Sequence, residues 1–254
     1  MRQIATRQEH EPRRRVRWRA GLALGLGLST MGLGVFYGAN WSTLHRLPAI
    51  VQTKLRRHHA AWTPLNRVSP WFTNALIATE DRSFYRNWGI SFQGIARAAL
   101  VDLHTGEFTQ GGSTITQQLI RDLMLSPAKT VSRKLSGVLL SLAATMLYTK
   151  PQLLTLYVNE VYLGDGAYGV GQASTRYFGI AASRLTLPEA SLLAGLPQAP
   201  SLYNPLAHYR LAKVRQQEVL QSMVQDHMIS EATARKAFAA ALPLRRPTPK
   251  RRAG

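Results

Sequence analysis

The pattern of apolar and polar residues along this chain predicts a protein made mostly of helices. In the central stretch, Gly111 and Gly112 lead into hydroxyl residues, and apolar residues then recur at Ile115, Leu119 and Leu123. This spacing places the apolar side chains on one face of a helix. The glycines before it allow the backbone to approach a ligand closely.

The start of this helix has the features of an anion site. Thr114 is followed three residues later by Gln117, which is typical of a capping box, so we expect the helix to begin near Thr114. Free N–H groups at a helix N-terminus, together with hydroxyls, amides and Arg121 two turns later, suit an anion, most naturally a phosphate. An ordinary capped helix that binds nothing is the alternative.

Similar patterns predict further helices along the chain. They cover approximately residues 70–80, 90–101, 131–148, 150–161, 173–178, 188–195 and 206–228. In the helix over 131–148, four apolar residues form one stripe that we expect to face the core: Leu135, Leu139, Leu142 and Met146. Strand signals are scarce, so the predicted fold class is mainly α.

An uncharged segment near the N-terminus predicts a membrane anchor. The 20 residues from Ala20 to Ala39 carry no charge, and about 20 apolar residues span a bilayer as a helix. A signal peptide is the rival interpretation, but its apolar region is usually shorter, about 7–15 residues. Arginines precede the segment, so the positive-inside rule places the N-terminus in the cytoplasm and the rest of the chain outside it. The predicted location is the cytoplasmic (inner) membrane, with one span.

Charge and composition narrow the function further. The net charge of the 254 residues is +19, and arginines and lysines gather at both ends. The chain has no cysteine, which excludes disulfides and thiolate metal sites. No nucleic-acid-binding signature accompanies the basic residues, so anionic lipid headgroups and pyrophosphates are the expected partners. The predicted division is a basic arm (1–19), an anchor (20–41), a connector (42–67), a main domain (68–240) and a basic tail (241–254).

Three places carry candidate chemistry. Glu80 ends an apolar helix and precedes Asp81; burial and a neighbouring carboxylate both raise a glutamate pKa, which suits a general acid or base. Arg133 and Lys134 open an amphipathic helix and could bind a pyrophosphate. Asn159 follows a run of core residues and could orient a loop or cap the helix. For each, a solvated or structural role is the alternative.

Five motifs then occur in an order that resembles glycosyltransferase family 51, the peptidoglycan glycosyltransferases. They are E-D-x-x-F at Glu80–Phe84, G-G-S-T-I-T-Q-Q-L at Gly111–Leu119, R-K at Arg133–Lys134, K-x-x-x-L-x-x-Y-x-N at Lys150–Asn159, and the segment Gly169–Gly179. The resemblance covers about residues 68–223.

This resemblance implies a lysozyme-like glycosyltransferase domain that polymerises lipid II into glycan strands at the outer face of the cytoplasmic membrane. Glu80 would be the catalytic base, with inversion at the donor sugar and undecaprenyl pyrophosphate as the leaving group. The implied substrate-binding residues are Asp81, Phe84, Ser113, Thr114, Gln117, Gln118, Arg121, Arg133, Lys134 and Asn159. A divalent cation, Mg²⁺ or Mn²⁺, often assists in the family, and no organic cofactor is expected. Expected partners are lipid II, the growing strand, the membrane and other cell-wall synthesis proteins.

The chain departs from the family pattern inside the motifs. The third motif usually reads R-K-x-x-E, and here Gly137 replaces its glutamate. Further positions differ from the family pattern. Asn87 replaces a histidine, Ser91 an aspartate, Arg121–Asp122 a Lys-Asn pair and Ile180 a lysine. Two alternatives therefore stand beside the polymerase: a catalytically impaired relative that binds lipid II or scaffolds a cell-wall complex, and an enzyme for a different polyprenyl-linked glycan.

Overall fold

The computed structural model describes residues 12–91, 94, 112–128 and 130–245. Side chains are described within these ranges except at residues 12–26, 28 and 29. The chain divides into two compact units, Met1–Leu44 and His45–Gly254. The helix predicted over 90–101 falls largely outside the described residues, as do most of the basic arm and tail.

The first unit is built on one helix, α1, which runs from Pro12 to His45. No helix in the described part of the chain is both long enough and apolar enough to cross a membrane. The anchor predicted over residues 20–41 falls on α1. The structure does not describe the side chains of residues 20–26, 28 and 29 in this segment. The anchor is therefore not confirmed.

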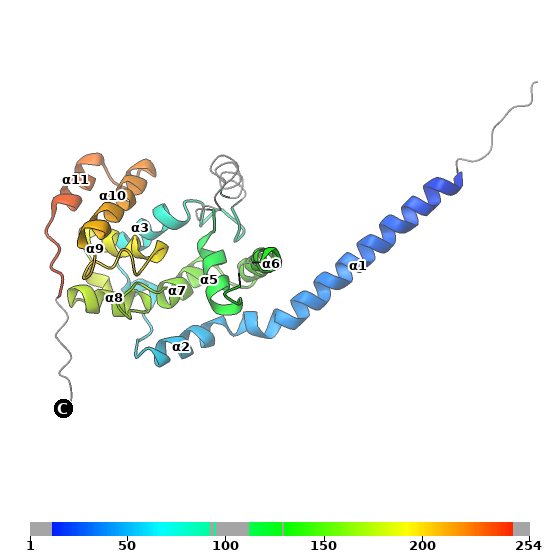
Figure 1. Ribbon diagram of the computed structural model, residues 1–254, viewed down its shortest axis with the longest axis horizontal. Helices are drawn as coiled ribbons and strands as arrows, with labels where there is room; N and C mark the ends of the chain where they lie inside the picture. Colours follow the sequence, from blue (N-terminus) through cyan, green and yellow to red (C-terminus); the bar gives the residue numbers. More distant parts are fainter. Residues whose placement is uncertain (1–11, 92–93, 95–111, 129, 246–254) are drawn as a thin grey trace, which may run out of the picture. The chain divides into compact units, whose positions relative to one another are not determined.

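Helices are the regular elements of the second unit within its described residues, and loops join them (Figure 1). Its α-helices are α2 (Leu47–Arg57), α3 (Pro70–Glu80), α5 (Ile115–Met124), α6 (Val131–Leu147), α7 (Lys150–Glu160), α8 (Gly169–Phe178), α9 (Leu187–Ala194), α10 (Tyr209–Gln225) and α11 (Glu231–Ala239). Short 3₁₀ helices cover Leu65–Arg67, Ala182–Arg184 and Leu196–Gln198. The mainly α fold class is thus confirmed.

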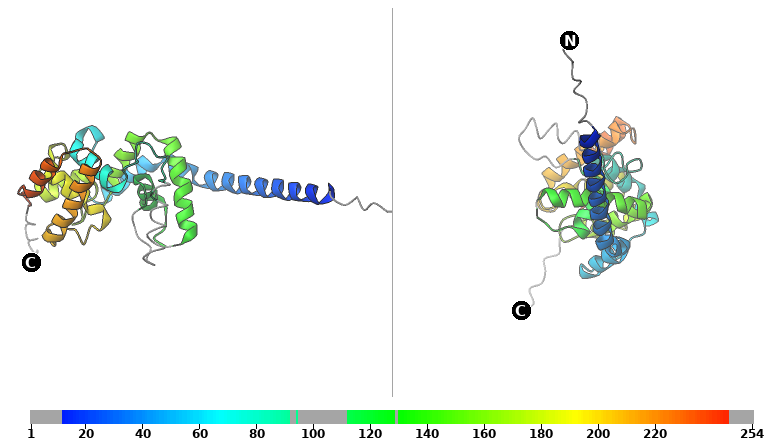
Figure 2. Two further views of the ribbon diagram at one scale, coloured as in Figure 1. Left: turned by 90° about the horizontal axis from the view of Figure 1, so that it is seen from above. Right: turned by 90° about the vertical axis from the view of Figure 1, so that its right-hand side faces the viewer.

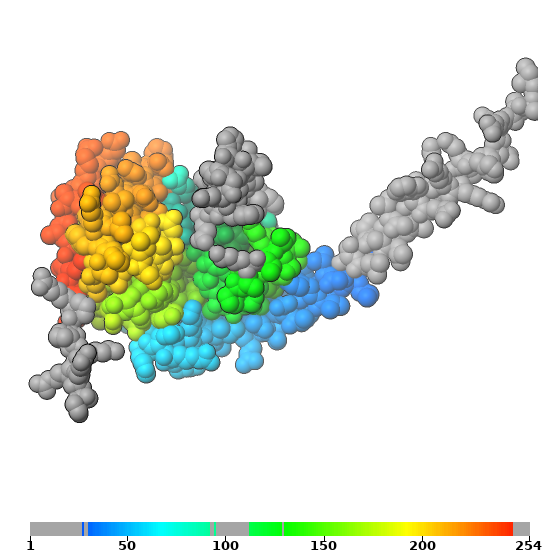
Figure 3. Space-filling view, viewed as in Figure 1, coloured from blue at the N-terminus to red at the C-terminus, as the bar shows by residue number. Residues whose placement is uncertain are grey.

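The helices of this unit pack in two groups, which the left view of Figure 2 separates clearly. In one group α3 packs against α9 and α10, and α10 also contacts α11. In the other group α5 packs against α6 and α7, and α2 lies along α7. Helix α8 contacts both α7 and α9 and so links the two groups. In the face of the molecule that Figure 3 shows, α9 and α10, in yellow and orange, lie on one side, and α5 and α6, in green, lie on the other.

The helix starts agree with the sequence prediction. Thr114 accepts from the backbone N–H of Gln117, and the side chain of Gln117 accepts from the N–H of Thr114, which completes the predicted capping box of α5. Thr149 and Gln152 form the same arrangement at the start of α7. These boxes satisfy N–H groups that a helix otherwise leaves without partners.

The core-facing stripe predicted for α6 is wrong. Leu135 is 59% exposed and Met146 is 80% exposed. The buried face consists instead of Gly137, Leu140, Ser141, Ala143 and Ala144. Small residues let a neighbouring helix approach closely, so the core contacts this face, on which Leu140 is the one large side chain, and not the predicted stripe.

Two helices of the unit have no counterpart in the sequence prediction. Helix α2 lies in the predicted connector and buries Leu47, Val51 and Leu55. Helix α11 follows the last predicted helix and buries only Ala237 among its residues. Both are short. The buried residues of α2 recur at every fourth position, a helical spacing that the prediction of a connector over residues 42–67 overlooked.

Candidate active site

Glu80 is the last residue of α3 and lies between the two groups of helices. Its side chain is 11% exposed. The residues before it, Ala75 to Ala78, are buried in the core, so the helix fixes the backbone of Glu80 firmly. The carboxylate therefore sits at the end of a rigid element with a small exposed area, as a catalytic group requires.

Gln118 of the second motif reaches this carboxylate. Its amide Nε2 donates to Oε2 of Glu80 at 2.7 Å. Its amide Oε1 accepts from the hydroxyl of Tyr157 at 2.8 Å. Tyr157 lies on α7 and is fully buried. The second and fourth motifs thus meet at the glutamate of the first.

The environment of Glu80 acts on its pKa in both directions. Burial raises the pKa, while the hydrogen bond from Gln118 and the positive charges of Arg215 and Arg121 lower it. The balance leaves the pKa above its ordinary value. A carboxylate with a raised pKa is a better proton acceptor at neutral pH, which fits the base predicted at Glu80.

Asp81 has a scaffolding position in the structure. It is buried, and its two oxygens accept from the side chains of Ser83 and Asn87 and from the backbone N–H of Ile115 at 2.9–3.2 Å. The last bond holds the first residue of α5. Asn87 in turn accepts from Lys150 of α7 at 2.9 Å. Asp81 therefore ties the end of α3 to α5 and, through Asn87, to α7.

Two other residues of the first two motifs, Phe84 and Thr114, are buried and make contacts within the protein. Phe84 is fully buried, and Nζ of Lys150 lies 4.8 Å from the centre of its ring. The hydroxyl of Thr114 donates to the carbonyl of Gly89 at 2.6 Å. Ser113, just before the helix, is exposed. Of these three predicted substrate-binding residues, only Ser113 is open to a ligand from solvent.

Gly89 holds a backbone conformation that the turn after the first motif requires. Its φ is +85°, and an added Cβ would lie 2.5 Å from the carbonyl oxygen of Ser141 on α6. Only glycine fits such a close approach in this conformation. Packing against α6 therefore requires glycine at position 89.

Two predicted cations stand at the start of α6. Arg133 is partly exposed, but its Nε is buried and has no hydrogen-bond partner among the described residues. Lys134 is exposed. One turn later Gly137 is buried, and a Cβ added there would lie 3.2 Å from Cδ1 of Leu125. The guanidinium of Arg133 thus has an unused donor where the family pattern has a glutamate nearby.

Arg121 lies on the exposed side of α5 and pairs with its neighbour. Its Nε contacts Oδ1 of Asp122 at 2.7 Å, and 45% of its side chain is exposed. Gln117, predicted to bind substrate, uses its side-chain oxygen to cap Thr114 at 3.0 Å. The charge of Arg121 lowers the pKa of Glu80, and because its side chain is partly exposed, Arg121 remains accessible to an anion.

The predicted loop-orienting role of Asn159 has structural support. Its Nδ2 donates to the carbonyls of Thr63 and Thr155, and its Oδ1 accepts from the N–H of Thr63, all at 2.7–2.8 Å. Asn159 is 1% exposed. It fastens the segment after α2 to the end of α7 and lies away from solvent.

Within the part of the chain that the structure describes, the side chains near Glu80 form no ready-made site for the expected divalent cation. The described residues contain no group of three or more His, Cys, Asp or Glu side chains that could hold a metal ion. Asp81 accepts four hydrogen bonds from the protein, and Asp122 pairs with Arg121. The described residues thus offer no set of ligands for this cation, which stays a prediction, and we assign it no step.

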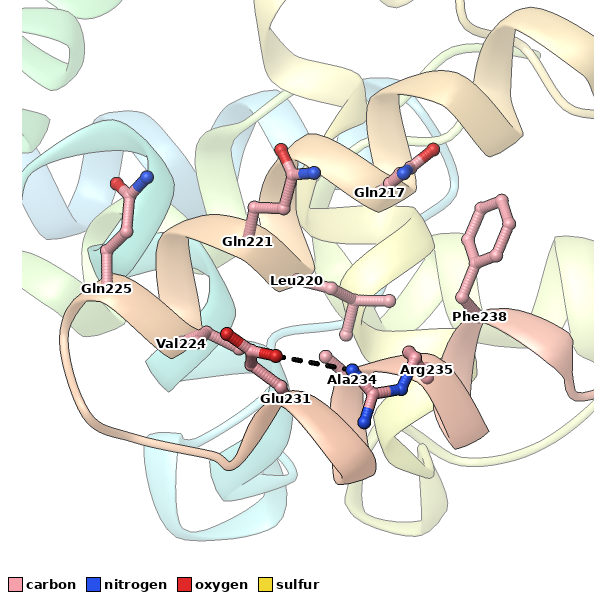
Figure 4. A pocket seen from close by; sticks show the side chains of 9 residues that line it. All are labelled: Gln217, Leu220, Gln221, Val224, Gln225, Glu231, Ala234, Arg235 and Phe238. Atoms are coloured by element: carbon pink, nitrogen blue, oxygen red, sulfur yellow. Dashed lines mark hydrogen bonds and ion pairs between the residues drawn. The ribbon is translucent and has the colours of Figure 1, made fainter.

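A pocket of about 360 Å³ lies elsewhere, between α10 and α11 (Figure 4). Leu220 and Val224 point from α10 toward α11, where Glu231 pairs with Arg235 across 3.2 Å. None of the residues that line the pocket is a predicted site residue. We therefore place the candidate active site at Glu80 and not in this pocket.

Sequence reasoning missed Arg215 and Tyr157 as parts of the site. Arg215 stands on α10 four residues before the buried Val219 and eight before the buried Met223. A charged residue in a buried stripe usually has a partner, and this signal was present in the sequence. Tyr157 lies inside the fourth motif, but its hydroxyl gave no signal of its own.

Comparisons with known proteins identify the family of this chain. A sequence model of the family described as Transglycosylase matches residues 48–224. This match covers more than half of the chain and contains every predicted site residue. The chain belongs to the transglycosylase family.

Similar curated proteins fall into two kinds. A Cupriavidus necator protein named as a candidate transglycosylase is 43% identical over 185 residues, which are 73% of this chain and 80% of that protein. Penicillin-binding protein 1A of Escherichia coli is 46% identical over 167 residues, which are 66% of this chain. Penicillin-binding protein 1A of Neisseria gonorrhoeae is 45% identical over 157 residues, which are 62% of this chain. The aligned part is 20% of each of these two longer proteins.

A crystal structure of penicillin-binding protein 1A from Haemophilus influenzae is also similar. The TM-score is 0.44 and the identity 22%, over 73% of this chain and 18% of that one. This likeness is too distant to bear on the function, so the family assignment rests on the sequence matches.

Proposed function

We propose that this protein is a peptidoglycan glycosyltransferase that polymerises lipid II, with Glu80 as the general base. The observation that carries the proposal is the position of Glu80. It lies at the end of a buried helix, hydrogen-bonded by Gln118 of the second motif at 2.7 Å. Peptidoglycan synthesis is consistent with the transglycosylase family match and with the similarity to penicillin-binding proteins.

The reaction is a displacement at the anomeric carbon of the donor. Glu80 takes the proton from the 4-hydroxyl of the acceptor GlcNAc, and that oxygen forms a bond to C1 of the donor MurNAc. The bond from C1 to the phosphate oxygen breaks, and undecaprenyl pyrophosphate leaves with the electron pair. Attack opposite to the leaving group inverts the configuration at C1. The raised pKa of Glu80 favours the proton transfer.

The leaving pyrophosphate needs positive charge close to it. Arg121 and Lys134 are exposed cations on α5 and α6, and Arg133 has a donor without a partner in the described protein. The N-terminus of α5, with Ser113 before it, adds a helix-dipole end that favours anions. These groups are our candidates for holding the pyrophosphate.

We further propose that the protein works at the outer face of the inner membrane. The support is the uncharged segment from Ala20 to Ala39 with arginines before it. Helix α2 adds exposed basic residues, Arg56 and Arg57, on the side opposite its buried Leu47, Val51 and Leu55. Basic side chains of this kind are attracted to anionic headgroups. The protein would then lie at the membrane surface in which its lipid-linked substrate is embedded.

The test is incubation of the detergent-solubilised full chain with labelled lipid II, with and without a divalent cation, and separation of the products by length. We expect glycan polymer from the wild type and none from Glu80→Gln. Thermal melting of both proteins shows whether the variant is folded. Polymer formation by a folded Glu80→Gln protein would exclude Glu80 as the base.

A second candidate function is a lipid II-binding scaffold without polymerase activity, and Gly137 is the observation that favours it. Position 137 is buried, and a side chain there would contact Leu125. The carboxylate that the third motif usually carries is therefore absent from a packed position. Binding of the pyrophosphate could persist through Arg133 and Lys134 while turnover is lost.

The same assay separates the two functions when Gly137→Glu is added. Polymer from Gly137→Glu but not from the wild type would identify the impaired relative. Lipid II binding by the inactive wild type, measured on nanodiscs with and without the lipid, would then support the scaffold. Polymer from the wild type rejects the scaffold as the main function. Polymer from another lipid-linked sugar, but not from lipid II, would indicate a different polyprenyl-linked glycan.

A further inference from the structure

Three side chains from three helices form a continuous chain of hydrogen bonds that ends on the catalytic base. Tyr157 of α7 donates to Gln118 of α5 at 2.8 Å, and Gln118 donates to Oε2 of Glu80 at 2.7 Å. Tyr157 is fully buried, so its hydroxyl is shielded from hydrogen bonding with bulk solvent. The chain joins both groups of helices through the base.

The direction of these hydrogen bonds is fixed by chemistry. The carboxylate of Glu80 can only accept, so the group that faces it must be the NH₂ of the Gln118 amide. The amide oxygen then faces the opposite way, where it needs a donor. Tyr157 supplies that donor, and its bond therefore favours the amide orientation that Glu80 requires.

The two oxygens of Glu80 differ as a result. Oε2 is occupied by Gln118, whereas the described contact of Oε1 is the charge of Arg215 at 3.9 Å, which is beyond hydrogen-bond distance. A proton that binds to Oε1 leaves Oε2 as a carbonyl oxygen, and a carbonyl oxygen still accepts from Gln118. The hydrogen bond can thus persist before and after the proton transfer.

We propose that Tyr157 is a positioning residue for the base: it orients Gln118, which holds Oε2 of Glu80 and leaves Oε1 to take the acceptor's proton. This inference rests on the proposed function, in which Glu80 is the base. It goes further because it assigns the reactive oxygen and gives a specific role to a buried tyrosine of the fourth motif.

Charged groups face Glu80 from three sides. Together with the hydrogen bond from Gln118 they set its pKa, and so they determine how removal of the Tyr157 hydroxyl should change that pKa. Arg215 approaches from α10 and Arg121 from α5, and both lower the pKa of Glu80, while Asp81 raises it. The hydrogen bond from Gln118 lowers it as well. In Tyr157→Phe the amide can rotate and present its oxygen to the carboxylate. The pKa of Glu80 should then rise, since the charged form loses a donor.

The experiment compares Tyr157→Phe with Tyr177→Phe in the full-length protein. Tyr177 is a matched control because it is also fully buried, and its hydroxyl donates to the carbonyl of Leu163 at 2.9 Å. In Tyr157→Phe we expect kcat to fall about tenfold with KM nearly unchanged, because orientation of a reacting group is lost. The acidic limb of the kcat/KM profile should move up by about half to one pH unit, the equivalent of one hydrogen bond. Tyr177→Phe should shift neither.

A double-mutant comparison tests whether Tyr157 acts through Gln118. In a Gln118→Leu background, Tyr157→Phe should cause no further shift of the acidic limb. A further shift of the same size would overturn the proposal, because Tyr157 would then act on Glu80 by another route. Gln118 is partly exposed, so Gln118→Leu also tests the chain where Tyr157→Phe does not fold.

A readout without turnover separates this inference from the proposed function. The carboxyl ¹³C signal of Glu80, assigned by its loss in Glu80→Gln, is titrated in the wild type and in both phenylalanine variants. We expect a higher pKa of Glu80 in Tyr157→Phe than in the wild type and in Tyr177→Phe. An unchanged pKa overturns the inference even where polymer forms. A raised pKa supports the positioning even if the protein makes no polymer from lipid II, a result that would reject only the polymerase.

Discussion

Arg215 brings a positive charge to within 3.9 Å of the carboxylate of Glu80, from a helix that begins more than a hundred residues later. The guanidinium is held in place by two other contacts. Its Nη1 pairs with Glu218 at 2.7 Å, and its Nε donates to the carbonyl of Gly195 at 3.2 Å. Arg215 therefore keeps its distance from Glu80 without forming a direct hydrogen bond, which leaves Oε1 of Glu80 able to accept a proton.

The first prediction concerns the charge of Arg215. Replacing it in Arg215→Met removes one of the influences that lower the pKa of Glu80, so that pKa should rise. The base then stays protonated to a higher pH, and the acidic limb of the kcat/KM profile for glycan synthesis should move upward. Arg210→Met is the control, since Arg210 is an exposed residue of the same helix. An upward shift in both variants would mean that general surface charge, not Arg215, sets the pKa.

The second prediction concerns the glycine in the third motif. Gly137 lies inside a helix, where alanine is favoured by up to about 1 kcal/mol. A Cβ there would press on Cδ1 of Leu125 at 3.2 Å, but that atom is the far end of a flexible, partly exposed side chain. We expect Gly137→Ala to raise the free energy of unfolding by a fraction of that amount, measured by chemical denaturation. A large loss would show that Leu125 cannot move, and Leu125→Ala should then relieve it.

The third prediction concerns Asn87, which stands between two charged groups. It donates to both oxygens of Asp81 and accepts from Lys150. Asn87→Leu leaves a buried carboxylate with fewer donors, and a loss of about 2–3 kcal/mol in the free energy of unfolding is expected. The exposed Asn74 on α3 provides the control Asn74→Leu, which should cost little. Equal losses in the two variants would contradict the scaffolding role of Asn87.

How far the sequence predicts this molecule depends on the range of the interactions. Capping at Thr114 and Thr149 is decided within four residues, and both helix starts were predicted correctly. The stripe of Leu135 and Met146 is also a local pattern, but the packing of α6 follows its small residues, which the pattern does not weigh. The leucine stripe therefore failed.

The site shows the same limit more strongly. The motifs identified Glu80 and Gln118 because their order along the chain resembles a known family. The contact between Glu80 and Arg215 joins residues 135 positions apart (215 − 80), and no local pattern encodes it. The same holds for Lys54 of α2, which pairs with Glu160 of α7. Side chains that meet across the fold are set by helix packing, which the sequence alone did not reveal.

The last prediction concerns Glu160, the buried member of that pair. Glu160 is 2% exposed, one of its oxygens has no hydrogen-bond partner among the described residues, and burial raises its pKa from 4.5 to about 7 although Lys54 and Arg121 oppose the shift. An acid with a raised pKa in the folded state loses its proton first in the unfolded chain. The folded state should therefore lose stability as the pH rises from about 4.5 to about 7 and lose no more above that.

The loss attributable to Glu160 should be about 3 kcal/mol, from about 1.4 kcal/mol for each pH unit of the shift. Glu80, whose pKa is also raised, adds a loss of the same sign, so the test compares the variants with the wild type across the range. Urea denaturation at a series of pH values should show a shallower decline for Glu160→Gln, which cannot ionise. Glu231→Gln changes a surface carboxylate that is 76% exposed and should follow the wild type. A decline in Glu160→Gln as steep as in the wild type would mean that Glu160 is already ionised well below pH 7, with Lys54 stabilising its charge fully despite the burial.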